Sequence, residues 1–315
     1  MLMKKLGKYL GITLLLAWVV CSCIKEDFSS ENNDSASVTV KLDTRAEDSQ
    51  ALANEGIESV RLILVQGGKI AVNEMIDFTK EANKPLLEKG ITLLGIKAGA
   101  TDFYAVVNET NVDYDFNTIT VGNLEENFNP SLKGFPTSNS EISLPMYGKA
   151  TADINKDNKT ITIAVTRAVA RIDLNIVNNT GDELTLNEVS FNEFFPNAGF
   201  LVNTPSPQND YSAPVFDKLN QNIPVSSDDK GTKAFTCYLY ESLKNPTTYE
   251  IGLKLGDKSY DPQPIQNFSS AIDKLARNTI LSITATINKK DEGTCAEITC
   301  SVKEWDVVKL PPTFE

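Results

Sequence analysis

LPMYGKATADINKDNKTITIAVTRAVARIDLNIV, residues 144–177, alternates apolar with polar side chains along much of its length, as a β-strand buried on one face does. From Ile161 to Val165 its inward apolar residues stand at odd positions, and from Ala168 onward they stand at even positions. Because successive side chains of a strand point to opposite faces, one flat strand cannot bury both sets. Two explanations are open: a β-bulge near Thr166–Arg167, or a chain that leaves one hydrophobic core there and enters another.

The length of the chain favours the second explanation. A chain of 315 residues is long for one β-sandwich and suits two. We therefore expect an amino-terminal β domain over residues 46–166 and a carboxy-terminal β domain over residues 167–315, with a hinge near Arg167.

The first 23 residues have the pattern of an export signal. A lysine-rich start precedes the apolar residues 10–20, a stretch about half as long as a bilayer span requires. Ser22 and Cys23 then fit the cleavage and lipidation site of a lipoprotein, which would anchor the chain in a membrane through several acyl chains. Cys21 fits less well because a bulky Val precedes it. The alternative is an ordinary signal peptide with a cysteine by chance.

Residues 24–45 are predicted to be a tether that ends in a single strand. The Ser-, Asn- and acid-rich residues 28–36 are typical of a solvated linker. In residues 38–42, Val38, Val40 and Leu42 share one face. An isolated strand is not stable, so this one must pair with the body of the protein or remain unstructured.

Further strands are expected on both sides of the hinge, at spacings that suit a sandwich better than alternating strands and helices. Two short helices are predicted, one over residues 74–83 that Pro85 would end and one over residues 266–277. Residues 204–233 are predicted to be a surface loop. The expected strands are 57–65, 91–96, 102–108, 184–195, 199–202, 235–240, 249–255, 279–287 and 296–308.

The composition argues against an enzyme and against a nucleic-acid-binding protein. The chain has no histidine, the commonest general base and nitrogen metal ligand, and it lacks a nucleophile elbow and a phosphate-binding glycine loop. Its net charge of −12 disfavours nucleic acid as a partner. We expect no cofactor and no bound metal.

One segment begins like a calcium-binding loop. Asp153, Asn155 and Asp157 have the right spacing, but Asn158 and Ala164 stand where such a loop has Gly and Glu. A turn between two strands is therefore the expected structure.

The cysteines beyond the signal show no metal-ligand spacing. Cys237 and Cys300 each lie in phase with apolar neighbours, and Cys295 makes the number odd. Buried reduced thiols are the favoured interpretation, and a disulfide between Cys237 and Cys300 is the alternative because export would permit one.

Four sets of residues stand out as motifs: Pro145–Gly148 followed by Val165–Ile172, the Ala98–Ala100 turn with Asn108, Arg277–Asn278 before a strand, and Val302–Trp305. Together they resemble the fimbrillins, the two-domain, lipoprotein-derived type V pilins that build surface fimbriae. The resemblance extends over almost the whole chain, although each motif alone is loose. It implies an all-β fold of two transthyretin-like β-sandwich domains in tandem.

The resemblance also implies a maturation pathway. The precursor would be an outer-membrane lipoprotein acylated at Cys23, and a surface Arg-specific protease would cut after Arg45 to leave Ala46 as the first residue. The cut removes the leader strand and opens a groove for the strand of another subunit. The alternative is that Arg45 is simply part of a linker.

In the family, a carboxy-terminal segment can fill the groove of a neighbour. A donor strand near residues 296–310 would present Val302, Val307, Val308 and Leu310. This would be β-strand addition, in which backbone hydrogen bonds supply affinity and alternate side chains set the register. The alternative is that these residues form only the last strand of their own domain.

The leading hypothesis is a structural pilin subunit of adhesive cell-surface fimbriae. Its partners would be other copies of itself and related pilin subunits, with a host or bacterial receptor for adhesion. One alternative is an accessory anchor or tip pilin. Another, from a different class, is a monomeric surface lipoprotein that binds a glycan or a protein through exposed Tyr238, Tyr240 and Tyr260.

Overall fold

The computed structural model describes residues 35–44, 56–126, 128–138, 142–155, 157, 159–243, 248–267, 270–290 and 293–304. Strands dominate these residues, so the expected all-β, sandwich-type fold is confirmed. Within the described ranges, no helix is long and apolar enough to cross a membrane.

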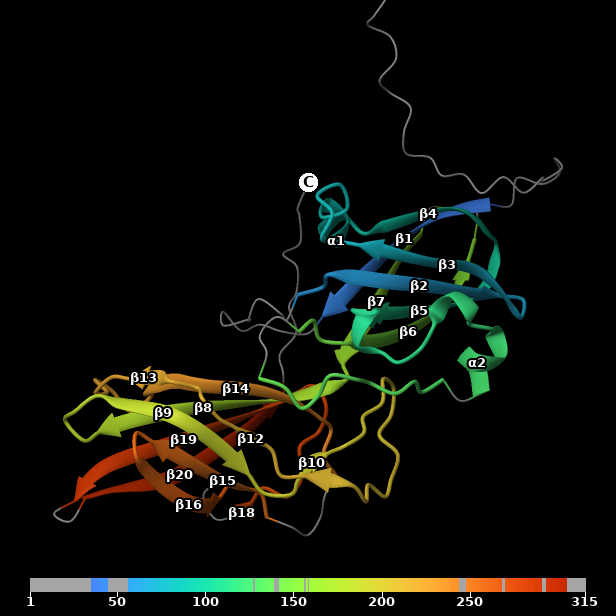
Figure 1. Ribbon diagram of the computed structural model, residues 1–315. Coiled ribbons are helices and arrows are strands. Elements are labelled where there is room, and N and C mark those ends of the chain that lie inside the picture. The colour runs from blue at the N-terminus through green and yellow to red at the C-terminus, as the bar shows by residue number, and fades with distance from the viewer. Residues whose placement is uncertain are drawn as a thin grey trace, which may run out of the picture. The chain divides into compact units, whose positions relative to one another are not determined.

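The first group of strands forms a seven-stranded sheet that bends into two layers. Its order is β3-β2-β5-β6-β7-β1-β4. β6 and β7 pair only at Met146 with Arg167 and at Tyr147 with Thr166, so the sheet folds over at this seam. The layers β3-β2-β5-β6 and β7-β1-β4 enclose one apolar core (Figure 1). The strands are β1 (Ser35–Thr44), β2 (Ser59–Gln66), β3 (Lys69–Asp77), β4 (Ile91–Lys97), β5 (Gly99–Val107), β6 (Met146–Ile154) and β7 (Lys159–Arg167).

The second group forms a sandwich of two separate sheets. One has the order β14-β8-β19-β20, and the other has the order β12-β9-β15-β16 with β13 also paired to β9. Alternate side chains from both sheets fill a second core. The strands are β8 (Val169–Asn179), β9 (Leu184–Phe191), β12 (Val215–Phe216), β13 (Gln221–Ile223), β14 (Thr232–Tyr240), β15 (Glu250–Leu255), β16 (Lys258–Pro264), β19 (Thr279–Lys290) and β20 (Gly293–Glu304). Two short pairs join β10 (Phe195–Pro196) to β11 (Tyr211–Ser212) and β17 (Gln266–Asn267) to β18 (Ser270–Ala271).

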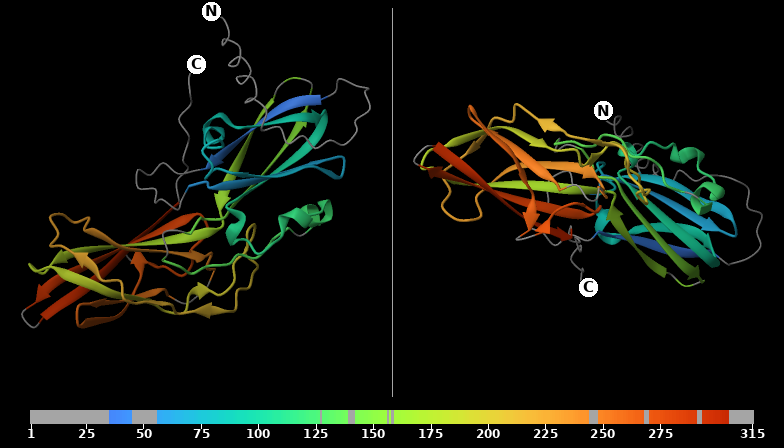
Figure 2. Two further views of the ribbon diagram at one scale, coloured as in Figure 1. Left: turned by 45° about the horizontal axis from the view of Figure 1, so that its top comes forward. Right: turned by 90° about the horizontal axis from the view of Figure 1, so that it is seen from below.

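In residues 144–177, the apolar positions change from odd to even where the chain passes from the first core to the second. Ile163 and Val165 belong to the first core, whereas Ala170 and Ile172 belong to the second. β7 ends at Arg167 and β8 starts at Val169, and Figure 2 shows the chain passing along them from one group of strands to the other. The bulge explanation is therefore not needed.

A third apolar cluster joins the two sandwiches. It brings Tyr104 of β5 and Val65 of β2 together with Leu201, Tyr240 and Ile280. The Tyr240 ring lies 5.6 Å from that of Phe135, and its hydroxyl donates a hydrogen bond to the Leu132 carbonyl at 3.1 Å. The outer faces of β2 and β5 and of the end of β14 are therefore buried against neighbouring segments rather than exposed to solvent.

Three of the predicted elements are wrong. Residues 74–77 belong to β3, where pairing with β2 outweighs helix propensity, and the helix α1 (Pro85–Lys89) begins at the proline expected to end one. Pro suits a first helical turn because its missing N–H would have no partner there. Residues 266–277 contain β17 and β18 instead of a helix, and residues 199–202 contribute one isolated bridge, from Phe200 to Ser131. The other helical segments are α2 (Val121–Glu126), η2 (Glu109–Asn111) and η3 (Phe116–Thr118).

Candidate functional site

Strand β1, which contains the expected leader strand, lies in the interior of the first sheet rather than at its edge. It runs parallel to β7, from Val38 beside Lys159 to Thr44 beside Val165, and antiparallel to β4, with Val40 beside Ile91. Hydrogen-bonded neighbours on both sides satisfy its backbone. β1 is thus bound along both edges by strands that come much later in the chain.

The inward side chains of β1 are part of the core. Val38 and Val40 are 0% exposed and Ala36 is 4% exposed, and Leu42 packs partly against the same cluster. Burying one such valine contributes about 1.5–3 kcal/mol. The expected one-faced strand over residues 38–42 is therefore present, lengthened at both ends, and it completes the hydrophobic core. We call the space that β1 fills, between β7 and β4, the leader groove.

The segment between β3 and β4 packs beside β1 and the first core. α1 lies in this segment and packs Leu86 and Leu87 against the core. Gly90 ends α1 with φ at 90°, a conformation that favours glycine, and donates its N–H to the Leu86 carbonyl at 2.9 Å. Sequence analysis missed Gly90, although a glycine between Glu-Lys and an apolar run is a helix-end signal.

Asn108 fixes the chain where it enters β2. Its backbone is left-handed, with φ at 55°, and its side-chain oxygen accepts hydrogen bonds from the N–H groups of Glu58 and Ser59 at 3.0 and 3.2 Å. The side-chain amide donates to the carbonyl groups of Gly56 and Leu144. Asn108 was noted in the sequence only for its resemblance to fimbrillins, and the structure gives it an anchoring role.

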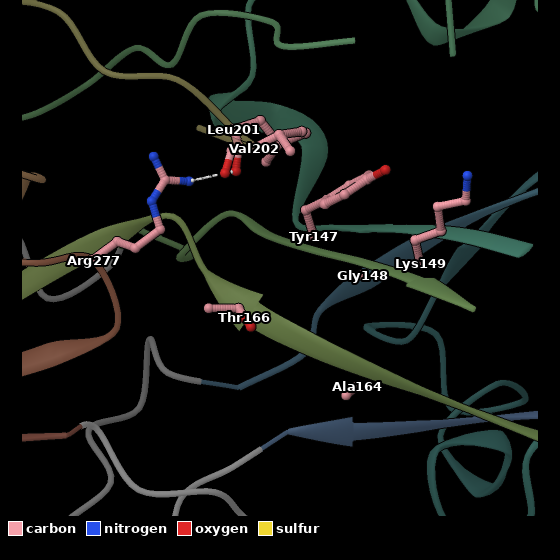
Figure 3. A pocket seen from close by; sticks show the side chains of 8 residues that line it. All are labelled: Tyr147, Gly148, Lys149, Ala164, Thr166, Leu201, Val202 and Arg277. Carbon is pink, nitrogen blue, oxygen red and sulfur yellow. Dashed lines mark hydrogen bonds between the residues drawn. The ribbon is translucent and has the colours of Figure 1, made fainter. Parts of the chain in front are cut away.

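A cavity of about 300 Å³ lies where β6 and β7 diverge. Figure 3 shows Tyr147 and Lys149 on β6, Thr166 on β7, and Arg277 opposite them. Arg277 donates to the carbonyl groups of Leu201 and Val202 at 2.9 and 2.8 Å, and it also binds Glu241 and Thr204. These contacts make Arg277 a structural tie for residues 201–204. Gly148 abuts β7 here, where a Cβ would stand 2.3 Å from the Ala164 carbonyl oxygen.

β20 is an edge strand whose inward residues pack on the second core. It pairs with β19 from Gly293 to Glu304, and Ala296, Ile298 and Cys300 contact the core. Val302 pairs with Leu281 and is 41% exposed. Of the four candidate donor residues, only Val302 lies within the described structure; Val307, Val308 and Leu310 lie outside it, as do Cys23, Arg45 and Ala46.

The three tyrosines considered for glycan binding do not form an exposed surface. Tyr238 is 1% exposed and Tyr240 is 3% exposed, because the outer face of β14 packs into the cluster that joins the sandwiches. Tyr260 is half-buried, and its hydroxyl is hydrogen-bonded to Thr294. The prediction that these tyrosines are exposed together is wrong, because it assumed that solvent covers the outer face of the sheet.

The alternative disulfide between Cys237 and Cys300 is also wrong, since both thiols are free. Cys237 lies on β14 and Cys300 on β20, and β8 and β19 stand between those strands. Neighbouring strands lie about 4.8 Å apart, so the separation exceeds the roughly 7 Å between Cα atoms that a disulfide can span. Burial raises the pKa of Cys237 well above its usual value and that of Cys300 to about 11.

Metal-binding chemistry finds no support among the described residues. No three Cys, Asp or Glu side chains gather there in a way that could hold a metal ion. The segment that begins like a calcium loop connects β6 to β7, with Asp157 N–H bonded to the Asn155 side chain at 3.2 Å.

The fold is similar to that of solved structures of fimbrial proteins and of proteins assigned to cell adhesion. A Bacteroides eggerthii protein assigned to cell adhesion matches with a TM-score of 0.57 at 18% identity, over 87% of this chain and 98% of that one. The fimbrilin FimA of Porphyromonas gingivalis W83 matches with a TM-score of 0.55 at 16% identity, over 89% and 99%. The P. gingivalis tip fimbrial protein Mfa3, truncated at its carboxy terminus, matches with a TM-score of 0.54 at 16% identity, over 86% and 100%.

These likenesses confirm the resemblance to fimbrillins at the level of the fold. No protein-family model matches the sequence, and no curated protein does.

Proposed function

We propose that this chain is a structural subunit of a cell-surface fimbrium that polymerises by β-strand exchange. The fold of fimbrial proteins supports this proposal, and the observation that carries it is the position of β1. β1 lies between two strands and contributes Val38 and Val40 to the core, yet it ends at Thr44, directly before Arg45. A cut after Arg45 would leave β1 held only by noncovalent contacts.

The precursor in this proposal is an outer-membrane lipoprotein acylated at Cys23, and the mature chain starts at Ala46. Loss of β1 would expose the apolar floor of the leader groove and unpaired backbone groups along β7 and β4. Such an open edge invites pairing with another strand, and a strand from a second subunit would restore both the core and the hydrogen bonds. We also propose that residues 46–166 and 167–315 are separate domains, joined near Arg167.

The donor in this proposal is the carboxy-terminal segment near residues 296–310. β20 is the edge strand of its sheet and alternates apolar with polar side chains, as the occupant of a groove closed on one face must. Donation requires β20 to leave β19, along which it pairs from end to end.

Identification of the first residue and the mass of the protein from the cell surface tests the proposal. A chain that begins at Ala46 and migrates as high-mass ladders that heat dissociates is expected. A monomer that begins at acylated Cys23 would overturn polymerisation by strand exchange and leave an anchor subunit or a monomeric surface lipoprotein.

An accessory anchor or tip pilin is the second candidate, and one observation favours it. Lys258 of β16 donates a hydrogen bond to Thr294 Oγ1 at 2.8 Å, and Tyr260 bonds the same hydroxyl, so β20 is fastened to the other sheet. A subunit that keeps β20 in place would accept a strand without donating one. Isolated fimbriae with this chain only at one end would support this role.

A further inference from the structure

The outer side of the leader groove contains a notch beside Gly90, which the side chains of Thr39 and Lys41 border. A Cβ at position 90 would stand 2.7 Å from Thr39 Cγ2, 3.0 Å from the Val40 carbonyl oxygen and 3.1 Å from Lys41 Cγ. The Thr39 methyl group therefore occupies space that any other residue at position 90 would fill. Gly90 is buried, so solvent does not compete for this space. We call it the Gly90 notch.

The other branch of the Thr39 side chain is also held. Its hydroxyl lies 3.2 Å from that of Thr92, which is its partner across β1 and β4. A β-branched side chain has a strongly preferred χ1 angle, and Thr39 places its methyl group in the notch and its hydroxyl towards β4. The notch and Thr92 together fit a β-branched residue.

The inward side chains alone do not fix the register of a strand in the leader groove. The inward residues Ala36, Val38 and Val40 are similar apolar side chains, so a slip by two residues would keep an apolar face towards the core. The outward residues are not equivalent, because neither Ser37 nor Lys41 has a branched Cβ with a methyl group. A slip by two residues would put Ser37 or Lys41 at the position of Thr39, and neither offers a γ-methyl group to the notch.

We propose that the Gly90 notch sets the register of whichever strand lies in the leader groove, by accepting the γ-methyl group of a β-branched residue. For β1 that residue is Thr39. For a strand that replaces β1 the inference rests on the proposed function, and it names the partner segment as β20 of a second copy, with Thr299 in the notch.

The sequence of β20 matches this requirement. With Thr299 at the position of Thr39, Ala296 takes the position of Ala36, and Ile298 and Cys300 take those of Val38 and Val40. Among the outward residues of this register, Glu297 and Ser301 flank Thr299, and neither carries a γ-methyl group. β20 therefore offers the notch a single residue between positions 297 and 301 that fits it.

A double-mutant cycle in the full chain tests the notch on β1 itself. Hydrogen exchange would follow the β1 amides in Gly90→Ala, Thr39→Ala and the double variant. Gly90→Ala is expected to lower β1 protection about tenfold or more, as overpacking a rigid site does. Thr39→Ala should recover part of that loss, because the Cβ introduced at position 90 then takes the space that the methyl group vacated.

Gly95→Ala is the matched control for backbone strain. Gly95 also has a positive φ, at 75°, but a Cβ there would meet nothing within 4 Å. Its effect on β1 should be smaller than that of Gly90→Ala and should add to that of Thr39→Ala. Equal losses in Gly90→Ala and Gly95→Ala, or additive effects of Gly90→Ala and Thr39→Ala, would overturn the proposal.

Displacement of β1 by peptides tests whether the notch selects the residue that an incoming strand places in it. The full chain, nicked after Arg45, would be incubated under reducing conditions with a peptide of residues 293–304 and with its Thr299→Val and Thr299→Ser forms. The Val peptide keeps the methyl group and lacks only the solvent-exposed hydroxyl contact with Thr92, so it should displace β1 about as well as the native peptide. The Ser peptide should bind about fourfold more weakly, because it lacks one buried methyl group.

Equal binding by the Ser peptide would refute the assignment of Thr299 to the notch. If none of the three peptides displaces β1, β20 is not the donor strand, and the proposed strand exchange through it is wrong. The hydrogen-exchange measurements on β1 would still decide whether the notch sets the register of β1.

Discussion

Arg61 and Glu109 form a two-pronged ion pair, with Nε to Oε2 at 2.6 Å and Nη2 to Oε1 at 2.9 Å. The Arg61 side chain is 7% exposed, and its remaining nitrogen donates to Asn73 at 3.0 Å, so the pair ties β2, β3 and η2 together. Removing one partner of a buried pair leaves the other charge without compensation.

Glu109→Gln should therefore lower the free energy of unfolding by about 2–3 kcal/mol, somewhat less than for a fully buried pair because Glu109 is 20% exposed. Urea denaturation measures the change. Glu81→Gln is the control, since the pair of Glu81 with Lys84 is exposed and should contribute at most about 0.5 kcal/mol. Equal effects of the two substitutions would contradict a stabilising role for Arg61 and Glu109.

Val38→Ala should speed the release of the leader strand from a chain nicked after Arg45. Both valine methyl groups are fully buried, so their loss costs about 2 kcal/mol and raises the dissociation rate roughly thirtyfold. Size-exclusion chromatography with mass spectrometry would follow the released peptide over time. Lys41→Ala, at an exposed position of the same strand, should change the rate little. Equal rates for both variants would show that core burial does not hold β1.

Asn108 combines a left-handed backbone with hydrogen bonds to both chain segments that flank it. Asn108→Ala should lower the unfolding free energy by about 3 kcal/mol, since it loses these bonds and disfavours φ at 55°. Asn108→Gly loses the same bonds but keeps the backbone conformation, so it should be about 1 kcal/mol less damaging. Thermal or urea unfolding of the two variants separates these contributions. If Gly is as harmful as Ala, the backbone conformation carries no cost at this position.

The Cys300 thiol should react slowly with alkylating reagents near neutral pH. Burial disfavours its thiolate and raises its pKa to about 11. Because the thiolate is the nucleophile, the alkylation rate should rise about tenfold per pH unit from about pH 7 to about pH 10 without levelling off. Peptide mapping by mass spectrometry gives the rate at Cys300 alone. A plateau near pH 9, the behaviour of an ordinary thiol, would show that Cys300 is accessible in solution.

Much of the fold could be predicted from alternation alone. The change of phase between Val165 and Ala168 marks the passage between cores, because a strand that changes partners must turn its other set of side chains inward. The one-faced pattern of Val38, Val40 and Leu42 likewise indicated a strand that needs partners. The helix expected over residues 74–83 failed, because β2 supplied a neighbour that local propensity does not reveal.

The sequence by itself determined the all-β class of the fold, the change of core near Arg167 and the absence of histidine chemistry, since each depends on residue types or short-range periodicity. Only the tertiary structure placed β1 inside the sheet, set Gly90 against Thr39, separated Cys237 from Cys300 and buried Tyr238 and Tyr240. These relationships join segments far apart in the chain. Alternation indicates which side of a strand is apolar, but the packing of the whole chain decides what covers each face.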